Sequence, residues 1–363
     1  MSKMSFLLFF ISLVGCDIDV DRVNNTKSLN IIDTKIVDLD PFYVEIPWGN
    51  FKSIRDGDFA GNIAIHNRSL REIVIVNHIN GSILSSYKYE NEGPDAVDSF
   101  VDFNIDVNNN LVCLSYLGIT IVNKSGNVIK KITFNDDKIK SELKKGESLT
   151  YCNPWQSSSK ITAHENFYYY FITKQEVDPT SLSFLKINPY TGEMERILVP
   201  FDSDIKKYES FSFLSNILSP QLNIGAKNEL LINFCYSSKA VIFKKGQSTK
   251  FDLKINDLLT PPKPQASVSE LANKLEDEAT IGILNEFPDA QKYILLKSNP
   301  KDDSPERDRK LYVYDINNPS LKPTIYQWPD NFTYDIFQLN DHYVAIDRRT
   351  NSDSELKLVF FSL

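Results

Sequence analysis

The fold is decided by the stretch "FVDFNIDVNNNLVCLSYLGITIVNKSGNVIKKI", residues 100–132. Short runs rich in Val, Ile, Leu and Phe alternate here with clusters of Asn, Asp, Ser and Gly. Runs of this length and composition are typical of β-strands, and the polar clusters between them are typical of tight turns. The stretch therefore predicts several short strands that follow one another through turns.

The same alternation continues outward from this stretch along most of the chain, whereas helical periodicity is scarce. Glycine-bearing turns follow strand-like runs at Gly81, Gly126, Gly192 and Gly246, roughly 45 to 65 residues apart, which approximates the blade length of a β-propeller. Some runs, such as "IVIV" at residues 73–76, are apolar at every position, so both faces of their sheet must be covered. Sheets stacked face to face meet this requirement.

The sequence thus predicts an all-β chain folded as a six-bladed β-propeller, with seven blades as the alternative count. The last predicted blade is short by one strand, and residues 30–46 are expected to supply it and close the ring. Residues 31–363 would then form a single propeller domain. The blades are expected at residues 51–92, 97–136, 148–203, 210–255, 279–328 and 331–363.

Two stretches interrupt the strand pattern and predict short helical insertions. Residues 260–280 begin with a proline-rich link and continue with Ser267 and Glu270 at the spacing of a capping box. Residues 135–149 are expected to form a second helix. Such an insertion is either a solvated decoration or a helix that binds a partner protein.

An apolar run at residues 4–14 follows Lys3 and ends shortly before a cysteine. The run is about half as long as a membrane-spanning helix, as expected for the apolar region of a secretory signal. The motif "LVGC" that closes it resembles the bacterial lipobox, in which a peptidase cuts ahead of a lipidated cysteine. We therefore predict a signal peptide at residues 1–15, a lipid on Cys16 that attaches the protein to a membrane, and a polar tether at residues 16–30. The alternative is a buried N-terminal strand with an incidental cysteine.

The charge balance of the chain limits its partners. The formal charge is −8, from 40 Lys and Arg against 48 Asp and Glu residues. A general nucleic-acid-binding surface requires clustered positive charge, so we expect no nucleic-acid partner. Beyond the first run, no apolar stretch approaches the roughly 20 residues of a membrane-spanning helix.

Residues 87–132, "YKYENEGPDAVDSFVDFNIDVNNNLVCLSYLGITIVNKSGNVIKKI", resemble Bacteroidota lipoproteins that fold as six-bladed β-propellers and are relatives of the NHL-repeat proteins. In that family a Gly-Pro turn and a following Phe lead into the strands, and Gly93, Pro94 and Phe100 stand at those places. The acidic residue usual before that Phe is replaced by Ser99. The resemblance implies a six-bladed propeller in the cell envelope, in a family of unknown function. Because acidic residues just after the lipidated cysteine accompany surface export in Bacteroidota, it also favours the outer membrane or cell surface over the inner membrane.

Three further cysteines, Cys113, Cys152 and Cys235, lie in or beside predicted strands. They are either small buried hydrophobic residues, or two of them form one disulfide in an oxidising envelope. The sequence leaves their pairing open, because an odd number cannot all pair internally. No C-x-x-C spacing indicates zinc or thiol redox chemistry.

Catalytic and metal sites are not indicated by the sequence, and we predict no catalytic residue, metal ion or cofactor. The chain has 4 histidines, and His66 and His78 would lie about 23 Å apart in their predicted hairpin, too far to share a metal. No catalytic, phosphate-binding or dinucleotide-binding motif is present. Carboxylate pairs for glycoside hydrolysis stay open, because their members are distant in sequence.

The aromatic block "NFYYYF", residues 166–171, has two interpretations, and Trp155 lies upstream of it. Its rings either pack between blades or stack on a sugar ligand. We expect a lipid-anchored envelope propeller that binds a ligand, protein or glycan with loops at one end of its central channel. The alternatives are an enzyme acting on glycans or another envelope substrate, with carboxylates from several blades, and a structural subunit of an envelope complex.

Overall fold

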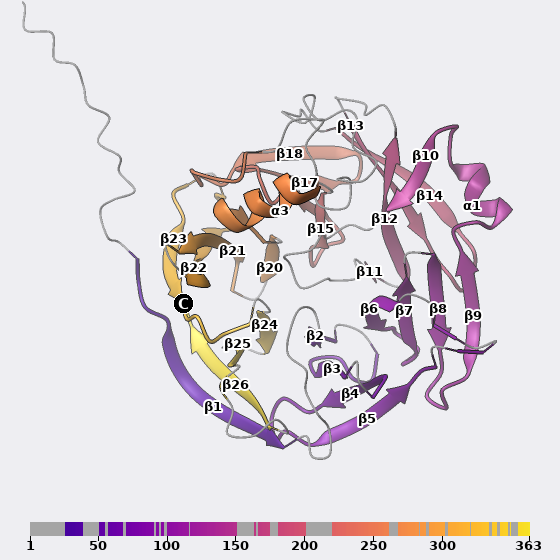
Figure 1. Cartoon of the computed structure of the whole chain (residues 1–363), viewed down its shortest axis with the longest axis horizontal. Helices are drawn as coiled ribbons and strands as arrows, with labels where there is room; N and C mark the ends of the chain where they lie inside the picture. Colours follow the sequence, from indigo (N-terminus) through magenta and orange to yellow (C-terminus); the bar gives the residue numbers. More distant parts are fainter. Residues whose placement is uncertain are drawn as a thin grey trace, which may run out of the picture.

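Six small antiparallel sheets surround a central axis in the computed structural model (Figure 1). The prediction of an all-β, six-bladed β-propeller with short helical insertions is confirmed, and the count is six blades rather than seven. The structure describes residues 26–38, 51–54, 57–67, 70–90, 92–93, 96–97, 100–115, 117–150, 163–164, 166–174, 181–200, 220–260, 268–282, 284–287, 290–301, 304–319, 321–333, 336–339, 342–347, 349 and 355–363.

Blades 1, 2 and 4 each consist of four consecutive strands, of which the first lies nearest the axis (Figure 1). Blade 1 is formed by β2 (Phe51–Ser53), β3 (Ile63–Asn67), β4 (Glu72–Val76) and β5 (Ile83–Lys88). Blade 2 is formed by β6 (Phe100–Ile105), β7 (Leu111–Ser115), β8 (Gly118–Val122) and β9 (Val128–Thr133). Blade 4 is formed by β15 (Gln221–Ile224), β16 (Leu230–Asn233), β17 (Lys239–Lys244) and β18 (Gln247–Asp252).

Blades 3 and 5 differ because two short strands share one edge of the next strand. In blade 3, β10 and β11 both pair with β12, and in blade 5, β19 and β20 both pair with β21. Blade 3 is formed by β10 (Glu147–Thr150), β11 (Ala163–His164), β12 (Phe167–Lys174), β13 (Ser181–Ile187) and β14 (Met194–Pro200). Blade 5 is formed by β19 (Thr280–Ile281), β20 (Asn285–Phe287), β21 (Lys292–Lys301), β22 (Ser304–Asp315) and β23 (Thr324–Trp328).

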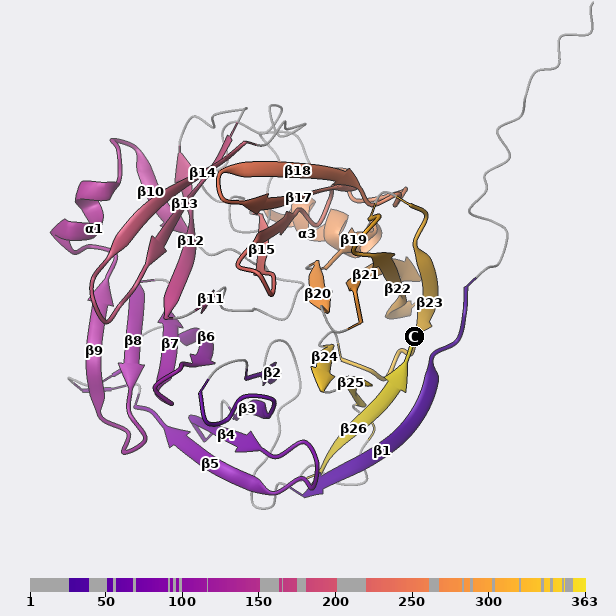
Figure 2. The same ribbon diagram turned by 180° about the vertical axis from the view of Figure 1, so that it is seen from behind.

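Blade 6 joins the two ends of the described chain. The C-terminal end supplies β24 (Phe337–Leu339), β25 (His342–Asp347) and β26 (Glu355–Ser362), and β1 (Asn30–Asp38) is the outermost strand (Figures 1 and 2). β1 pairs antiparallel with β26 along its length. This pairing gives the C-terminal segment its fourth strand, and residues 39–46 lie outside the described residues.

The hydrophobic core is divided into clusters that lie between neighbouring blades. Val74 and Val76 of β4 belong to a cluster shared with blade 6, whereas Ile73 and Ile75 belong to a cluster shared with blade 2. Successive side chains of a strand point to opposite faces of the sheet. The run "IVIV" is apolar throughout because both of its faces are covered by other blades.

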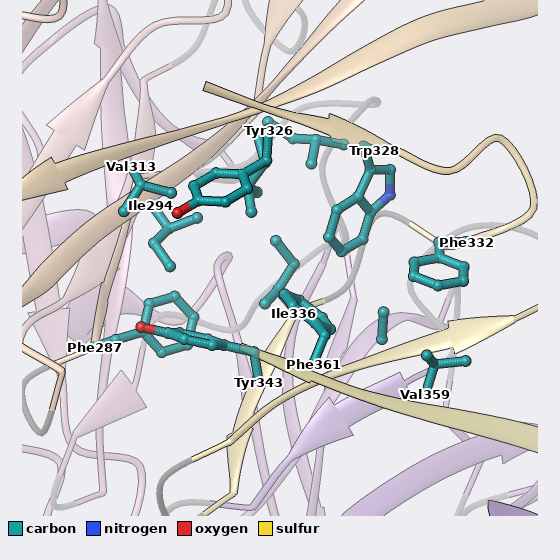
Figure 3. Close-up of a cluster of buried hydrophobic side chains, with 13 residues drawn as sticks. Phe287, Ile294, Val313, Tyr326, Trp328, Phe332, Ile336, Tyr343, Val359 and Phe361 are labelled. Atoms are coloured by element: carbon teal, nitrogen blue, oxygen red, sulfur yellow. The ribbon is translucent and has the colours of Figure 1, made fainter. Parts of the chain in front are cut away.

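Figure 3 shows the cluster between blades 5 and 6, with Trp328 at 0% exposure. The rings of Phe332 and Phe361 meet the indole edge-on, with centroids 5.4 and 5.7 Å away. The indole Nε1 donates a hydrogen bond to the carbonyl of Thr333 at 3.0 Å. The side chain is therefore both closely packed and satisfied in its polar group, which stabilises the contact between these blades.

Two short helices lie in connectors between blades, in stretches where the sequence predicts helical insertions. α1 (Asp137–Glu142) connects blades 2 and 3, and its Ile139 is buried in the cluster between them. α3 (Val268–Asp277) connects blades 4 and 5, and Arg307 donates a 2.6 Å hydrogen bond to the carbonyl of Glu278 just after it. No helix in the described part of the chain is both long and apolar enough to span a bilayer.

Candidate functional site

β12 presents two different faces to its neighbours. Tyr168 and Tyr170 are each 1% exposed and lie in the cluster between blades 2 and 3. Phe167, Tyr169 and Phe171 alternate with them, lie on the face toward blade 4 and are half-buried. Packing between blades thus accounts for the two buried tyrosines, and the other face of β12 borders a cavity.

The cavity forms where the apolar contact between blades 3 and 4 gives way to polar residues. Phe171 lies opposite Phe184 of β13, which is fully buried. Two residues closer to the start of β12, Tyr169 lies opposite Lys186, which in turn lies opposite Glu195 of β14. The first row packs against blade 4, whereas the second row lines the cavity.

The cavity has a volume of about 400 Å³ and is lined by both blades. Blade 4 contributes the apolar side chains of Leu230 and Phe243, and the tight turn between β17 and β18 contributes Lys245 and Gly246. The φ angles of these two turn residues are +48° and +80°. Left-handed backbone at both positions is typical of a two-residue hairpin turn. This turn lies at the cavity, and Lys245 is one of its two central residues.

Lys186 links an aromatic ring and a carboxylate at this site. Its Nζ lies 4.1 Å from the centroid of the Phe167 ring and 3.2 Å from Oε2 of Glu195. The side chains of Lys186 and Glu195 are 22% and 58% exposed, so this ion pair is open to solvent and contributes little to stability. The pair is therefore free to rearrange when a ligand enters.

Arg196 also lines the cavity, but its charge is neutralised by a partner elsewhere. Its guanidinium makes two 2.8 Å hydrogen bonds to the carboxylate of Glu147 on β10. The hydrogen bond with Glu147 raises the pKa of Arg196. This two-pronged contact holds β14 to β10 within blade 3. The other charged residues of the lining are Lys186, Lys245 and Glu195, two basic and one acidic.

A second group of polar and aromatic side chains lies between blades 1 and 2. Lys52 of β2 and Asp102 of β6 form an ion pair, with 2.6 Å between Nζ and Oδ1. His66 Nε2 shares a 2.8 Å hydrogen bond with the hydroxyl of Tyr89. Phe100, the aromatic residue of the family resemblance, stacks on Tyr89 with centroids 4.9 Å apart and lies 4.5 Å from the His66 ring.

This second group is closed to ligands. Lys52, His66, Tyr89 and Asp102 are at most 7% exposed. The ion pair takes one member from each blade, and separating the blades would leave a buried charge without its counter-ion. We assign the group a structural role, which is to hold the innermost strands of blades 1 and 2 together.

Glu229 and Glu286 both lie close to the turn at Gly225. Two neighbouring carboxylates are the catalytic groups of most glycoside hydrolases, so we describe this pair in detail. A Cβ added to Gly225 would lie 2.2 Å from Oε2 of Glu286 and 2.9 Å from Oε2 of Glu229. The two carboxylates accept hydrogen bonds from the N–H groups of Ala226 and Lys227, at 2.9 and 2.8 Å. Burial and the charge of Glu229 raise the pKa of Glu286, whereas burial of Glu229 is outweighed by hydrogen bonds that lower its pKa. Both carboxylates therefore brace the turn at Gly225.

The structure shows where His66, His78, Cys113 and Cys235 lie. His66 and His78 lie at opposite ends of the β3–β4 hairpin. No group of three or more His, Cys, Asp or Glu residues in the described part could hold a metal ion. Cys113 and Cys235 are buried thiols, and burial raises the pKa of both, that of Cys235 to about 12.

Several residues singled out in the sequence lie outside the described residues, and these are Cys16, Pro94, Ser99, Cys152, Trp155 and Ser267. The sequence predicted a possible ligand contact at the aromatic block of β12, but it did not indicate Lys186, Glu195 or Lys245. The first two depend on strand register, and all three depend on which blades are neighbours. A signal existed only for Lys245, because "KKG" between two strand-like runs marks a tight turn. The cavity lies between two blades, and binding at the end of the channel stays a prediction.

One family model matches residues 27–276, more than half of the chain, and it describes a domain of unknown function, DUF4221. The chain belongs to the DUF4221 family. The range matched by the DUF4221 model contains the described strands of blades 1 to 4. It therefore includes both the cavity between blades 3 and 4 and the buried group between blades 1 and 2.

The fold of this DUF4221 protein is similar to that of solved structures from Bacteroides. A member of the DUF4221 family from Bacteroides vulgatus is 13% identical, with a TM-score of 0.69 over 93% of this chain and 98% of that one. A putative exported protein from Bacteroides fragilis is 10% identical, with a TM-score of 0.52 over 93% and 98% of the two chains. At these identities the likeness shows the fold alone. No curated protein sequence matches the chain.

Proposed function

We propose that this DUF4221 protein is a lipid-anchored binding module of the cell envelope that takes its ligand in the cavity between blades 3 and 4. The cavity is the observation that carries the proposal. Its volume of about 400 Å³ lies within the range of small-molecule sites, roughly 300 to 1,000 Å³. Both aromatic and charged residues line it. The ligand is a glycan or a short protein segment rather than a nucleic acid.

The anchor is proposed from the N-terminal sequence, in which residues 1–15 have the features of a signal peptide and Cys16 is the lipidated residue. The backbone of Lys27, 11 residues later, is hydrogen-bonded to blade 5, so an extended tether would reach at most about 40 Å. The proposed location is the outer membrane or the cell surface.

Two measurements test the anchor and its location. Radiolabelled palmitate is expected to label the wild type but not Cys16→Ala, and equal labelling of both would contradict the anchor. Residues 1–25 attached to a soluble reporter are expected to make it sensitive to protease on intact cells. Protection of the reporter would place it on the inner side of the envelope.

Ligand binding is tested with the full mature lipoprotein in detergent, by calorimetry against a panel of oligosaccharides and peptides. Phe167→Leu keeps an apolar side chain but removes the flat ring, and is expected to weaken binding about fivefold. The matched control is Phe134→Leu. Phe134 is also half-buried, but it packs against the cluster between blades 2 and 3, away from the cavity. Equal weakening by both variants would count against the cavity.

A further inference from the structure

The charged side chains of the cavity narrow the class of ligand. Lys186 and Lys245 both belong to its lining, and Glu195 is the acidic residue of that lining. Lys186 lies over the Phe167 ring at 4.1 Å, so positive charge and aromatic surface face the same space. A ligand that fills this space meets both at once.

We infer that the cavity binds an acidic oligosaccharide, a chain of sugars that carry carboxylate groups. This inference rests on the proposed function and names the ligand class of the same site. The face of a sugar ring is apolar and fits against Tyr169, beside the Phe167 ring that Lys186 covers. The sugar carboxylate accepts charge-assisted hydrogen bonds from Lys186 and Lys245. A neutral sugar would leave the positive charge of the cavity without a counter-ion.

Glu195 is the internal competitor of such a ligand. It is the 3.2 Å partner of Lys186, and its side chain is 58% exposed. A sugar carboxylate can take its place because Glu195 then moves into water and no buried charge is left unpaired. While it remains nearby, its negative charge repels the ligand. Removal of this acidic residue should therefore tighten binding, an effect opposite to that of removing a residue that holds the ligand.

The test compares an oligogalacturonide with its methyl ester, which keeps the same rings and linkages but lacks the charge. Calorimetry with the full mature lipoprotein in detergent is expected to show about tenfold tighter binding of the acid at low salt. The difference should shrink as the salt concentration rises, because the lysines are accessible to solvent.

Three charge variants and one control locate the effect. Lys186→Gln and Lys245→Gln are each expected to weaken binding of the acid several-fold and to leave binding of the ester unchanged. Glu195→Gln is expected to tighten binding of the acid. Lys250→Gln changes an exposed lysine of β18 that does not line the cavity, and should have no effect. Thermal unfolding of each variant shows that it remains folded.

The outcomes separate this inference from the proposed function. Equal affinity for acid and ester, with both weakened by Phe167→Leu, would overturn the acidic ligand and leave the binding module in place. Weaker binding of the acid by Glu195→Gln would also overturn it, because Glu195 would then be a ligand contact. Another outcome is that neither sugar binds, but a different ligand of the panel does and Phe167→Leu weakens its binding. This outcome would overturn the acidic oligosaccharide and leave the proposed binding module in place. If no ligand of the panel binds, the proposed function falls as well.

Discussion

The replacement Asn233→Leu tests how the interrupted inner strand of blade 5 is held in place. Asn233 ends β16 in blade 4 and is 0% exposed. Its Nδ2 donates hydrogen bonds to Gln221 Oε1 at 2.8 Å and to the carbonyl of Gly282 at 3.0 Å. Its Oδ1 accepts a 3.0 Å hydrogen bond from the N–H of Leu284. Gly282 and Leu284 lie between β19 and β20, where the inner strand of blade 5 is interrupted. The side chain of Asn233, from blade 4, thus supplies hydrogen-bond partners to backbone groups at this interruption.

Leucine has nearly the shape of asparagine but can make none of these hydrogen bonds. The N–H of Leu284, the carbonyl of Gly282 and the side chain of Gln221 would each lose a partner where water is excluded. Each such loss costs about 1 to 3 kcal/mol, and the new apolar side chain recovers part of it, so we expect a loss of about 3 to 6 kcal/mol in the free energy of unfolding. With an unfolding entropy of about 0.7 kcal/mol/K for a domain of this size, the midpoint of thermal unfolding should fall by about 4 to 9 °C.

Urea and thermal unfolding measure the loss, and amide hydrogen exchange shows where it occurs. Exchange should accelerate first at residues 280–287, in the inner strands of blade 5. The control is Asn318→Leu, an exposed asparagine in the β22–β23 turn, which should change the stability by at most about 0.5 kcal/mol. A loss under about 1 kcal/mol for Asn233→Leu, or faster exchange spread evenly over all blades, would refute the reasoning.

Three further predictions follow from buried groups elsewhere in the ring. Lys52→Met leaves the carboxylate of Asp102 buried without its ion pair and should cost about 3 to 5 kcal/mol, whereas Lys52→Met combined with Asp102→Leu should recover most of this in urea unfolding. Gly118→Ala would place a Cβ 1.9 Å from the carbonyl oxygen of Ile132, so β8 and β9 must separate; we expect a loss of about 3 kcal/mol, and a loss below about 1 kcal/mol in thermal unfolding would contradict the close approach. Burial alone would raise the pKa of Asp347, but hydrogen bonds to its carboxylate outweigh it and the pKa is lowered. A lowered pKa stabilises the fold at pH values above about 4 and the gain is lost as the pH falls, so the stability difference between the wild type and Asp347→Asn should shrink below about pH 4.

The blade pattern could be predicted because it depends on local properties of the chain. Strand length, turn residues and the two-faced apolar run at residues 73–76 are all visible without knowing which blades touch. The interruption of the inner strand in blade 5 could not be predicted. It depends on Gln221 and Asn233, whose partners lie 49 to 60 residues further along the chain. Amide side chains are common in turns, so the sequence alone gave no reason to expect these two in the core.

In the candidate site, too, only the local features could be predicted from the sequence. The alternation of β12 indicates that some of its rings face away from the buried tyrosines, and this much is a local property. Lys186 and Glu195 join Tyr169 only through the register of three strands, and Lys245 reaches the same space from another blade. A residue's distance from the aromatic block in the sequence says nothing about these contacts. The charge of the cavity, on which the ligand class depends, therefore required the folded chain.

The positions of β1 and the cavity bear on how a ligand would reach an anchored propeller. β1 enters blade 6, whereas the cavity lies between blades 3 and 4, across the central axis from it (Figures 1 and 2). Just before β1, the backbone of Lys27 makes hydrogen bonds to Ile325 and Gln327 of blade 5, at 2.9 and 2.8 Å. The backbone is thus fixed to the ring at Lys27, 11 residues after Cys16 in the sequence. Under the proposed lipid anchor, the cavity would lie on the side of the ring away from the tether's attachment. This arrangement suits capture of a water-soluble ligand such as an acidic glycan.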